Sequence, residues 1–334
     1  IYRKDAEPTN NLVDFAAFVA LFPHLVAGPI LRYSLLAPQL RQRTHSMELF
    51  SLGVSRFMLG FIMKVLIADS LAPMNSLFIR EPELQFTDAW FGLFISTLQL
   101  YFDFAGYSNM AIGLALMMGF RFAENFNQPW VSQSVTEFWQ RWHITLAHFL
   151  RDYVYMPLVR KRIAGPMVAL VYTMLLSGVW HGASIAFVCW GLFFGVAMVV
   201  ERKLGIATKL NTPYNFLRNM RTFVLIGVSM PLFFTSNMAH SLDIYAGMFG
   251  FNGFGSLDLY TLGASRMAIA FVALAVIWLV LAGINNVRFY AGNKTGYFMR
   301  HVGGMQSLLL WCGFLLSLSS LTANSFSPFL YFQF

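Results

Sequence analysis

Three ionisable side chains lie in stretches where a helix that faces lipid would not place them, and there they could do chemistry. His181 lies within SGVWHGAS, inside a run from Ala164 to Val200 that contains no Asp, Glu, Lys or Arg. A histidine has an ordinary pKa of about 6.5, so His181 can accept a proton near neutral pH and act as a general base. The other two are His143 and Asp103, and at membrane depth such groups mark a cavity, a pathway or an ion pair.

Each of these side chains also has a structural interpretation. His181 could hydrogen-bond across helices as part of their packing, and His143 could be a buried core residue or a contact to lipid headgroups. Asp103 could form an ion pair with Arg141 or Arg151. The residues alone leave both interpretations open.

Asp103 belongs to a polar stripe within the sequence STLQLYFDFAGYSNM. Ser96, Gln99, Asp103 and Tyr107 recur at spacings that place them on one face of a helix. Such a face does not suit lipid, so we expect it to contact protein or to line a water-filled cavity.

The stretch TEFWQRWHITLAHFLRDYVYMPL predicts one amphipathic helix over 136–157, closed by Pro157. Its apolar stripe consists of Phe138, Trp142, Leu146, Phe149 and Tyr153, and its polar side holds Glu137, Arg141, His148 and Asp152. Glu137 and Arg141 are four residues apart and can pair. His143 has apolar helical neighbours, so it is expected on the buried side.

The composition predicts a membrane protein. Of 334 residues, 57% are hydrophobic, 17% aromatic and 11% charged, and the mean hydropathy is +0.58, whereas soluble domains are about 45–50% apolar and 25% charged. Apolar segments fall at 12–31, 49–72, 89–119, 164–180, 183–200, 222–236, 266–287 and 305–323. Since about 20 apolar residues cross a bilayer, we predict an all-α polytopic integral membrane protein. It would have about eight transmembrane or re-entrant helices around an intramembrane polar cavity.

Basic residues gather in alternate loops. If the segments alternate sides, the loops 32–48, 121–162, 201–221 and 288–300 hold 17 of the 23 Lys and Arg, whereas 1–11, 73–88, 237–265 and 324–334 hold three. Positively charged loops stay in the cytoplasm, so the first set is predicted to be cytoplasmic. The net charge of +8 then reflects topology, and we expect contact with membrane lipid and no nucleic-acid partner.

Other catalytic signatures are missing from the sequence. It contains no serine nucleophile elbow, HExxH zinc motif, phosphate-binding P-loop or dinucleotide fingerprint. Cys189 and Cys312 lie in apolar runs without metal-ligand spacing. We therefore expect neither a metal site nor a tightly bound cofactor.

Six blocks, in order along the chain, resemble the membrane-bound O-acyltransferase family, and within it the bacterial alginate O-acetyltransferases. They are LFPHLVAGPI (21–30), YFDFAGYSNMAIGL (101–114), GFRFAENFNQPW (119–130), FWQRWHITLAHFLRDYVYMPL (138–158), GVWHGAS (178–184) and SPFLYFQF (327–334). The resemblance implies a single membrane-bound O-acyltransferase domain over 1–334, lacking the N-terminal transmembrane spans with which such proteins ordinarily begin. The stretch MPLVRKRIAGP departs from the family's pattern, because a glycine-containing loop is expected there, and this leaves donor contacts near 160–162 open.

The resemblance also implies roles for individual residues. His181 matches the family's near-invariant histidine and His143 its second conserved polar position, so both are expected to be catalytic. His181 would act as general base toward an acceptor hydroxyl, and His143 would orient the donor or polarise its carbonyl; an acyl-histidine relay is also compatible. Substrate contacts are expected from Asp103, Tyr107, Asn125, Glu137, Arg141, Trp142, Arg151 and Trp180.

The family transfers acyl groups to hydroxyl groups. The resemblance implies that acetyl moves from a cytoplasmic donor, acetyl-CoA, across or at the inner membrane, in which the chain would be multi-pass. Periplasmic acetyl-transfer partner proteins would complete O-acetylation of an exopolysaccharide such as alginate. Two other classes fit the composition and topology: a transporter with Asp103, His143 and His181 as a proton relay, and a non-catalytic scaffold of a polysaccharide export complex.

Overall fold

The chain forms two compact helical units. The structure, a computed structural model, describes residues 11–255 except 26, 27, 82, 209, 211 and 236, most of 269–279, and 304–323. Every regular element in these residues is helical, and none is a strand. The first unit comprises Ile1–Leu66, Phe104–Asn125 and Arg288–Phe326, and the second comprises Ile67–Asp103, Phe126–Val287 and Ser327–Phe334. The predicted all-α class therefore holds for the described residues.

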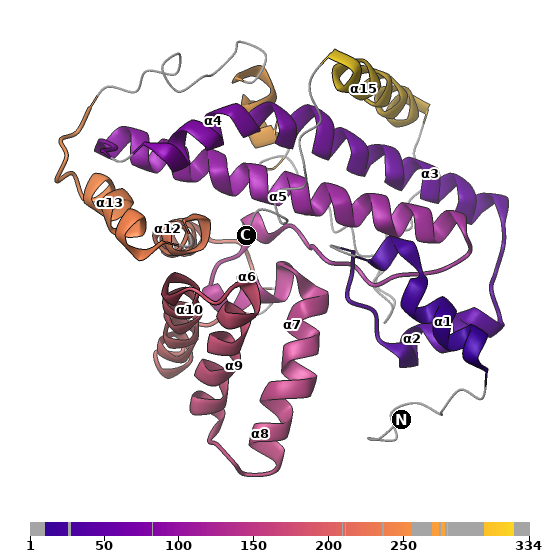
Figure 1. The fold of residues 1–334 in the computed structure, drawn as a ribbon, viewed down its shortest axis with the longest axis horizontal. Coiled ribbons are helices and arrows are strands. Elements are labelled where there is room, and N and C mark those ends of the chain that lie inside the picture. Colours follow the sequence, from indigo (N-terminus) through magenta and orange to yellow (C-terminus); the bar gives the residue numbers. More distant parts are fainter. Residues whose placement is uncertain are drawn as a thin grey trace. The chain divides into compact units, whose positions relative to one another are not determined.

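The first unit is built on the pairing of α3 (Met47–Ile62) with the second half of α5 (Phe86–Met117) (Figure 1). Glycines permit this close approach, since a Cβ on Gly60 would lie 2.5 Å from the carbonyl oxygen of Gly106. α15 (Gly304–Ala323) packs along α3. The other described elements of this unit are α1 (Leu12–Ala20), η1 (Phe22–His24) and α2 (Tyr33–Arg41).

A buried ion pair, which the sequence analysis missed, lies within the first unit. Arg56 on α3 is 6% exposed, and Glu124, which follows α5 in the chain, is 5% exposed. The guanidinium and carboxylate meet as a two-pronged fork, with Arg56 Nη1 donating to Glu124 Oε1 at 3.0 Å and Nη2 to Oε2, while Arg56 Nε donates to Asn109 Oδ1. Because buried charges are tolerated only when they are paired, this fork fixes α3 to the segment after α5.

The second unit contains the two predicted histidines. Its elements are α4 (Asp69–Arg80), which continues from η2 (Met63–Ala68), the first half of α5, η3 (Pro129–Val131), α6 (Val135–Arg141), α7 (Ile144–Leu150), η4 (Arg151–Tyr155), α8 (Met156–Arg160), α9 (Pro166–His181), α10 (Ile185–Lys203), α11 (Phe216–Ser229), α12 (Pro231–Phe234) and α13 (Met238–Met248). α9 and α10 form a tight hairpin, in which Gly178 lies against the backbone of Phe187 and Gly191 against that of Met174. Figure 1 shows this hairpin beside α7 and α8.

Three helices in the described residues are long and apolar enough to cross a membrane. They are Met47–Arg80, Ile185–Lys203 and Gly304–Leu321, and Pro166–His181 is a shorter apolar helix. The predicted segments 12–31 and 266–287 lie partly outside the described residues. The number of about eight transmembrane or re-entrant helices therefore stays a prediction.

The prediction of one continuous amphipathic helix over 136–157 was wrong. The stretch is divided into α6, α7, η4 and α8, with a break at Trp142 and His143, and Pro157 lies inside α8 instead of ending a helix. His143 has φ 45°, in the left-handed region that a non-glycine residue rarely adopts. The backbone carbonyl of Arg141 accepts from Asn127 N at 2.8 Å, so a tertiary contact uses the carbonyl that would otherwise continue the helix.

The expected faces of that stretch were also partly wrong. Glu137 and Arg141, expected on the polar side, are 1% and 8% exposed, whereas Phe149 and Tyr153 of the expected apolar stripe are 39% and 40% exposed. The physical reason is that the polar pair finds hydrogen-bond partners inside the unit, and exposed aromatic residues cost little in a chain surrounded by lipid.

Candidate functional site

His181 is the last residue of α9 and lies among aromatic rings. Its ring centroid is 4.9 Å from that of Trp180, 5.2 Å from Trp190 and 5.1 Å from Phe233. The predicted apolar segments 164–180 and 183–200 are two separate helices, because α9 ends at His181 and α10 begins after Ser184. The imidazole therefore lies at the turn that joins the C-terminus of α9 to the N-terminus of α10.

His143 lies at the break between α6 and α7 and is 4% exposed, as its predicted place on the buried side requires. Its ring centroid is 6.2 Å from that of Trp180, which in turn contacts His181. The structure therefore brings together His143, Trp180 and His181, which were predicted from separate blocks of the sequence.

The strained backbone of His143 is itself a functional signal. Residues held in the left-handed region cost about 1–3 kcal/mol and persist where the surrounding structure imposes them, which happens often at active sites. Here the constraint comes from α6 on one side and from α7, which begins directly at Ile144, on the other.

A cavity of about 190 Å³ opens beside His181 within the second unit. Its wall is formed by Trp90, Leu93, Phe94, Thr97, Leu100, Trp130, Phe138, Trp139, Trp142, His181, Trp190, Phe194, Phe223, Val224, Ile226, Gly227, Met230 and Phe233. His181 is the ionisable side chain of this wall, and aromatic rings make up most of the rest. A polar cavity was predicted, whereas the wall of this cavity is mainly aromatic and His181 is its basic side chain.

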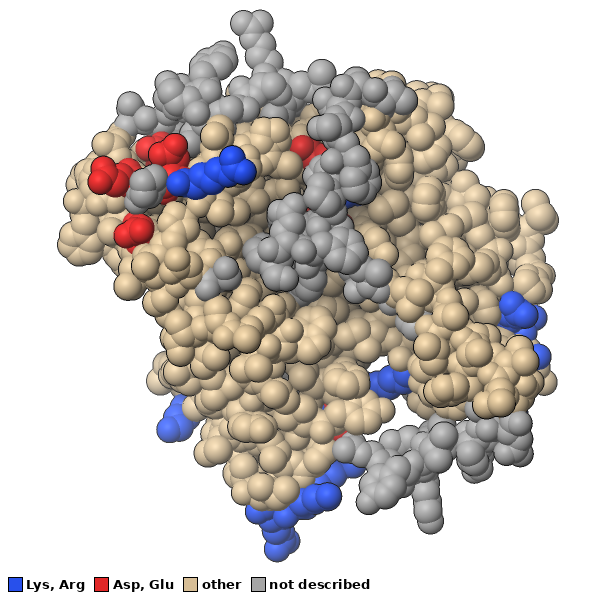
Figure 2. All heavy atoms as spheres, in the orientation of Figure 1, with Lys and Arg blue, Asp and Glu red and all other residues tan. Residues whose placement is uncertain are grey.

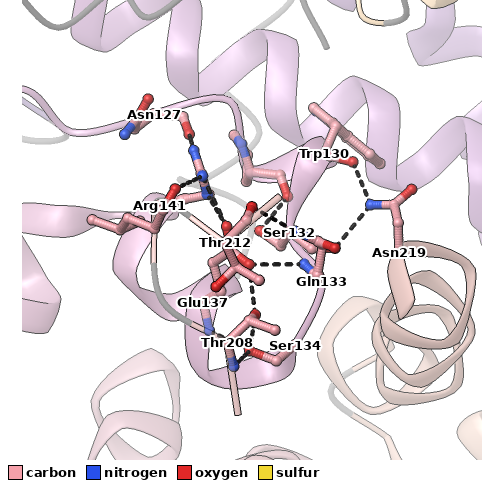
Figure 3. A network of polar contacts seen from close by, with 12 residues as sticks. Asn127, Trp130, Ser132, Gln133, Ser134, Glu137, Arg141, Thr208, Thr212 and Asn219 are labelled. Carbon is pink, nitrogen blue, oxygen red and sulfur yellow. Dashed lines mark hydrogen bonds and ion pairs between the residues drawn. The ribbon is translucent and has the colours of Figure 1, made fainter. Parts of the chain in front are cut away.

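A network of hydrogen bonds fixes α6 within the second unit (Figure 3), and His143 lies two residues after the end of this helix. The predicted pair of Glu137 and Arg141 is confirmed, with Arg141 Nε donating to Glu137 Oε1 at 2.9 Å. Glu137 Oε2 accepts from Gln133 N at 3.0 Å and from Thr208 Oγ1 at 2.7 Å. Both groups are buried and fully engaged, so the geometry makes them positioning residues for the turn at His143.

Arg141 also ties two loops to α6. Its Nη1 donates to the carbonyl of Asn127 at 3.0 Å and its Nη2 to the carbonyl of Leu210 at 3.1 Å. Figure 3 shows Arg141 beside Asn127 and, at the other end of the network, Asn219, which donates to the carbonyls of Trp130 and Ser132. One guanidinium therefore joins segments from three parts of the second unit.

Glu201 is a site residue that sequence reasoning missed. It lies near the end of α10 and is 3% exposed, and its carboxylate accepts from Val135 N at 2.7 Å, Thr136 N at 2.9 Å and Thr136 Oγ1 at 2.8 Å. A carboxylate at a helix N-terminus is stabilised by the free N–H groups and the helix dipole. Glu201 thereby anchors the start of α6 to α10.

The other predicted substrate residues lie elsewhere. Arg151 is exposed and pairs with Asp152 at 2.7 Å, and the guanidinium of Arg141 pairs with Glu137. Asp103 is 1% exposed in the second unit. Tyr107 and Asn125 belong to the first unit, where they donate to the carbonyl of Leu25 and to Ser108 Oγ. Their predicted substrate contacts stay predictions.

Comparisons with known proteins agree with the resemblance. The model for a family described as membrane-bound O-acyltransferases matches residues 6–241. A probable alginate O-acetylase of Pseudomonas putida is 42% identical, and the alignment covers 100% of this chain and 71% of that protein; the corresponding protein of Azotobacter vinelandii is 43% identical with 100% and 72% covered. A peptidoglycan O-acetyltransferase of Helicobacter pylori is 36% identical over 73% of this chain and 48% of that protein.

Proposed function

The chain belongs to the membrane-bound O-acyltransferase family, and we propose that it passes acetyl groups from cytoplasmic acetyl-CoA toward an exopolysaccharide such as alginate. The observation that supports this proposal is that His181 lies in the wall of the aromatic cavity and that Trp180 contacts both His181 and His143. The names of relatives support acetyl as the group and alginate as the acceptor, since alginate O-acetylases are 42–43% identical and the peptidoglycan enzyme 36%.

His181 would be the general base of this reaction. It would remove the proton of an acceptor hydroxyl as the hydroxyl oxygen bonds to the thioester carbonyl carbon, and would return that proton to the departing thiolate when the carbon–sulfur bond breaks. His143, held rigidly by the turn between α6 and α7, would orient the donor or donate a hydrogen bond to its carbonyl. Aromatic walls that exclude water would favour transfer to a hydroxyl over hydrolysis.

The proposed setting is the bacterial inner membrane, with periplasmic partner proteins that deliver acetyl to the polysaccharide. Charge on the second unit supports one orientation. The exposed basic loop 160–162 joins α8 and α9, whereas exposed Glu81, Glu83 and Asp243 lie around the α4–α5 loop and on α13. Figure 2 shows the basic group at the bottom and the acidic group at the left. The basic end would be cytoplasmic, in keeping with the positive-inside rule.

Vesicles that contain the full-length protein and its partner proteins test the function. We expect radiolabelled acetyl from acetyl-CoA to appear as ester on added alginate when the donor is supplied on the cytoplasmic side and the acceptor on the opposite side. Vesicles without the protein, and vesicles with the donor on the wrong side, are the controls. Labelled acetyl that crosses the membrane without any ester forming would favour a transporter.

Cysteine labelling tests the orientation. In a background with Cys189 and Cys312 replaced by alanine, Leu204→Cys and Phe251→Cys place single thiols at positions that are 66% and 81% exposed. We expect a membrane-impermeant maleimide to label position 251 in whole cells and position 204 only after permeabilisation, because 201–221 is proposed to be cytoplasmic and 237–265 periplasmic. The opposite pattern would overturn the topology.

A further inference from the structure

We propose that the indole N–H groups of Trp139 and Trp190 hold the carbonyl oxygen of the acyl donor next to His181. This inference rests on the proposed function and adds two residues to its reaction. Trp139 on α6 and Trp190 on α10 both line the cavity, and their ring centroids are 5.6 Å apart. The ring of Trp190 lies 5.2 Å from that of His181.

Both indole groups are buried donors that the described residues leave unused. Trp139 is 8% exposed and Trp190 is 3% exposed, and the Nε1 atom of each is buried without an acceptor in the described part of the chain. Trp90, in the same wall, provides a contrast because its Nε1 donates to the carbonyl of Met248 at 3.2 Å. Since buried polar groups in proteins are nearly always hydrogen-bonded, these two donors, like the Nε1 of Trp130 in the same wall, call for a partner that the described residues do not supply.

The chemistry of the partner follows from the donors. An indole can only donate a hydrogen bond, so its partner must carry an acceptor oxygen, and a hydrocarbon chain would leave both groups unsatisfied. The aromatic wall suits a small group with one polar atom, and an acyl carbonyl has this character. His181 beside Trp190 places a base where a hydroxyl would attack such a carbonyl.

The two donors would act most strongly during the reaction. When the acceptor oxygen bonds to the carbonyl carbon, the π electron pair moves onto the carbonyl oxygen, and this oxygen becomes negative until the carbon–sulfur bond breaks and the thiolate leaves. Donors that already point at a developing negative charge, in a site that excludes water, lower the barrier more than they strengthen binding of the ground state. Both indole rings make edge-to-face contacts with Phe194, whose ring centroid lies 5.2 Å from that of Trp139 and 5.1 Å from that of Trp190. These contacts fix both rings in place.

Single Trp139→Phe and Trp190→Phe variants of the full-length protein test the inference, because phenylalanine keeps an aromatic ring and removes the N–H. With acetyl-CoA as donor, we expect each variant to lower kcat by about 10²-fold, the usual effect of losing one such donor, and to leave the donor KM within about threefold. The exposed Trp311→Phe, on α15 in the first unit, is the control for a tryptophan change and should keep wild-type kcat.

A spectroscopic measurement separates this role from a structural one. In a His181→Gln background, which holds the donor without turnover, the infrared band of a ¹³C-labelled acetyl-CoA carbonyl should shift to higher wavenumber when Trp139 or Trp190 is replaced, because a hydrogen bond to the oxygen has been lost. Unchanged kcat in both variants, or a lower amount of folded protein with an unchanged carbonyl band, would overturn the inference while leaving the proposed function intact. If wild-type protein itself transfers no acetyl, the proposed function fails first and this inference fails with it.

Discussion

His181→Gln is expected to reach the membrane at a normal level and to lower acetyl transfer by about 10²–10⁴-fold, the usual contribution of a general base. Glutamine can still hydrogen-bond, but it cannot take up a proton at neutral pH. His181 is the basic side chain of the cavity wall, so no neighbour there can replace it. The measurement is acetyl ester on the polysaccharide, normalised to the amount of protein in the membrane.

A control on the same helix shows whether the loss is specific. Tyr172→Phe removes a hydroxyl from the exposed side of α9, where Tyr172 is 52% exposed, and should leave both the protein level and acetyl transfer unchanged. Near-normal transfer by His181→Gln would remove His181 from the reaction. Equal loss of protein and of activity would instead indicate that the imidazole is needed for packing between Trp190 and Phe233.

The place of His181 in the fold could be predicted from local sequence. A charge-free run interrupted by histidine and glycine gives two apolar helices with a turn between them, and α9 and α10 have those boundaries. The start of α6 also had a local signal, since Ser134 and Glu137 form a serine-x-x-glutamate pattern typical of a helix N-terminus. Ser134 Oγ does accept from Glu137 N at 3.0 Å. Short-range hydrogen bonding decides such features, so the sequence reveals them.

The break at His143 could not be predicted in this way. Helical periodicity across 136–157 is good, and the break arises because the backbone carbonyl of Arg141 accepts from Asn127 N. The guanidinium of Arg141 also donates to the carbonyl of Leu210, 69 residues further along the chain. The same holds for the cavity, whose tryptophans come from α5, η3, α6, the residue directly after α6, and α10. Contacts between distant segments follow no local spacing, so only the folded chain shows that five indole rings and His181 share one wall.

Glu137→Ala is expected to lower the free energy of unfolding by about 3–5 kcal/mol, because it leaves the guanidinium of Arg141 buried without its counterion. Glu137 is 1% exposed and Arg141 is 8% exposed, so water cannot take the place of the lost carboxylate. Thermal unfolding in detergent, followed by tryptophan fluorescence, measures the change. Arg151→Ala is the matched control: it breaks an arginine–carboxylate pair whose arginine side chain is 54% exposed, and such a surface pair contributes about 0–1 kcal/mol.

The same variant decides what Glu137 does. The sequence resemblance predicts that Glu137 contacts substrate, whereas the structure gives its carboxylate three partners within the protein, which are Gln133 N, Thr208 Oγ1 and Arg141. If the structural role is right, Glu137→Gln should recover only part of the stability and activity, because its amide oxygen can still accept from Gln133 N and Thr208 Oγ1 but Arg141 keeps no counterion. Normal stability of Glu137→Ala together with a raised KM for the donor would contradict this role and return Glu137 to the substrate site. We expect instead that the activity of Glu137→Ala falls in proportion to the amount of folded protein. The reason is that α6 no longer fixes the turn that places His143 beside Trp180.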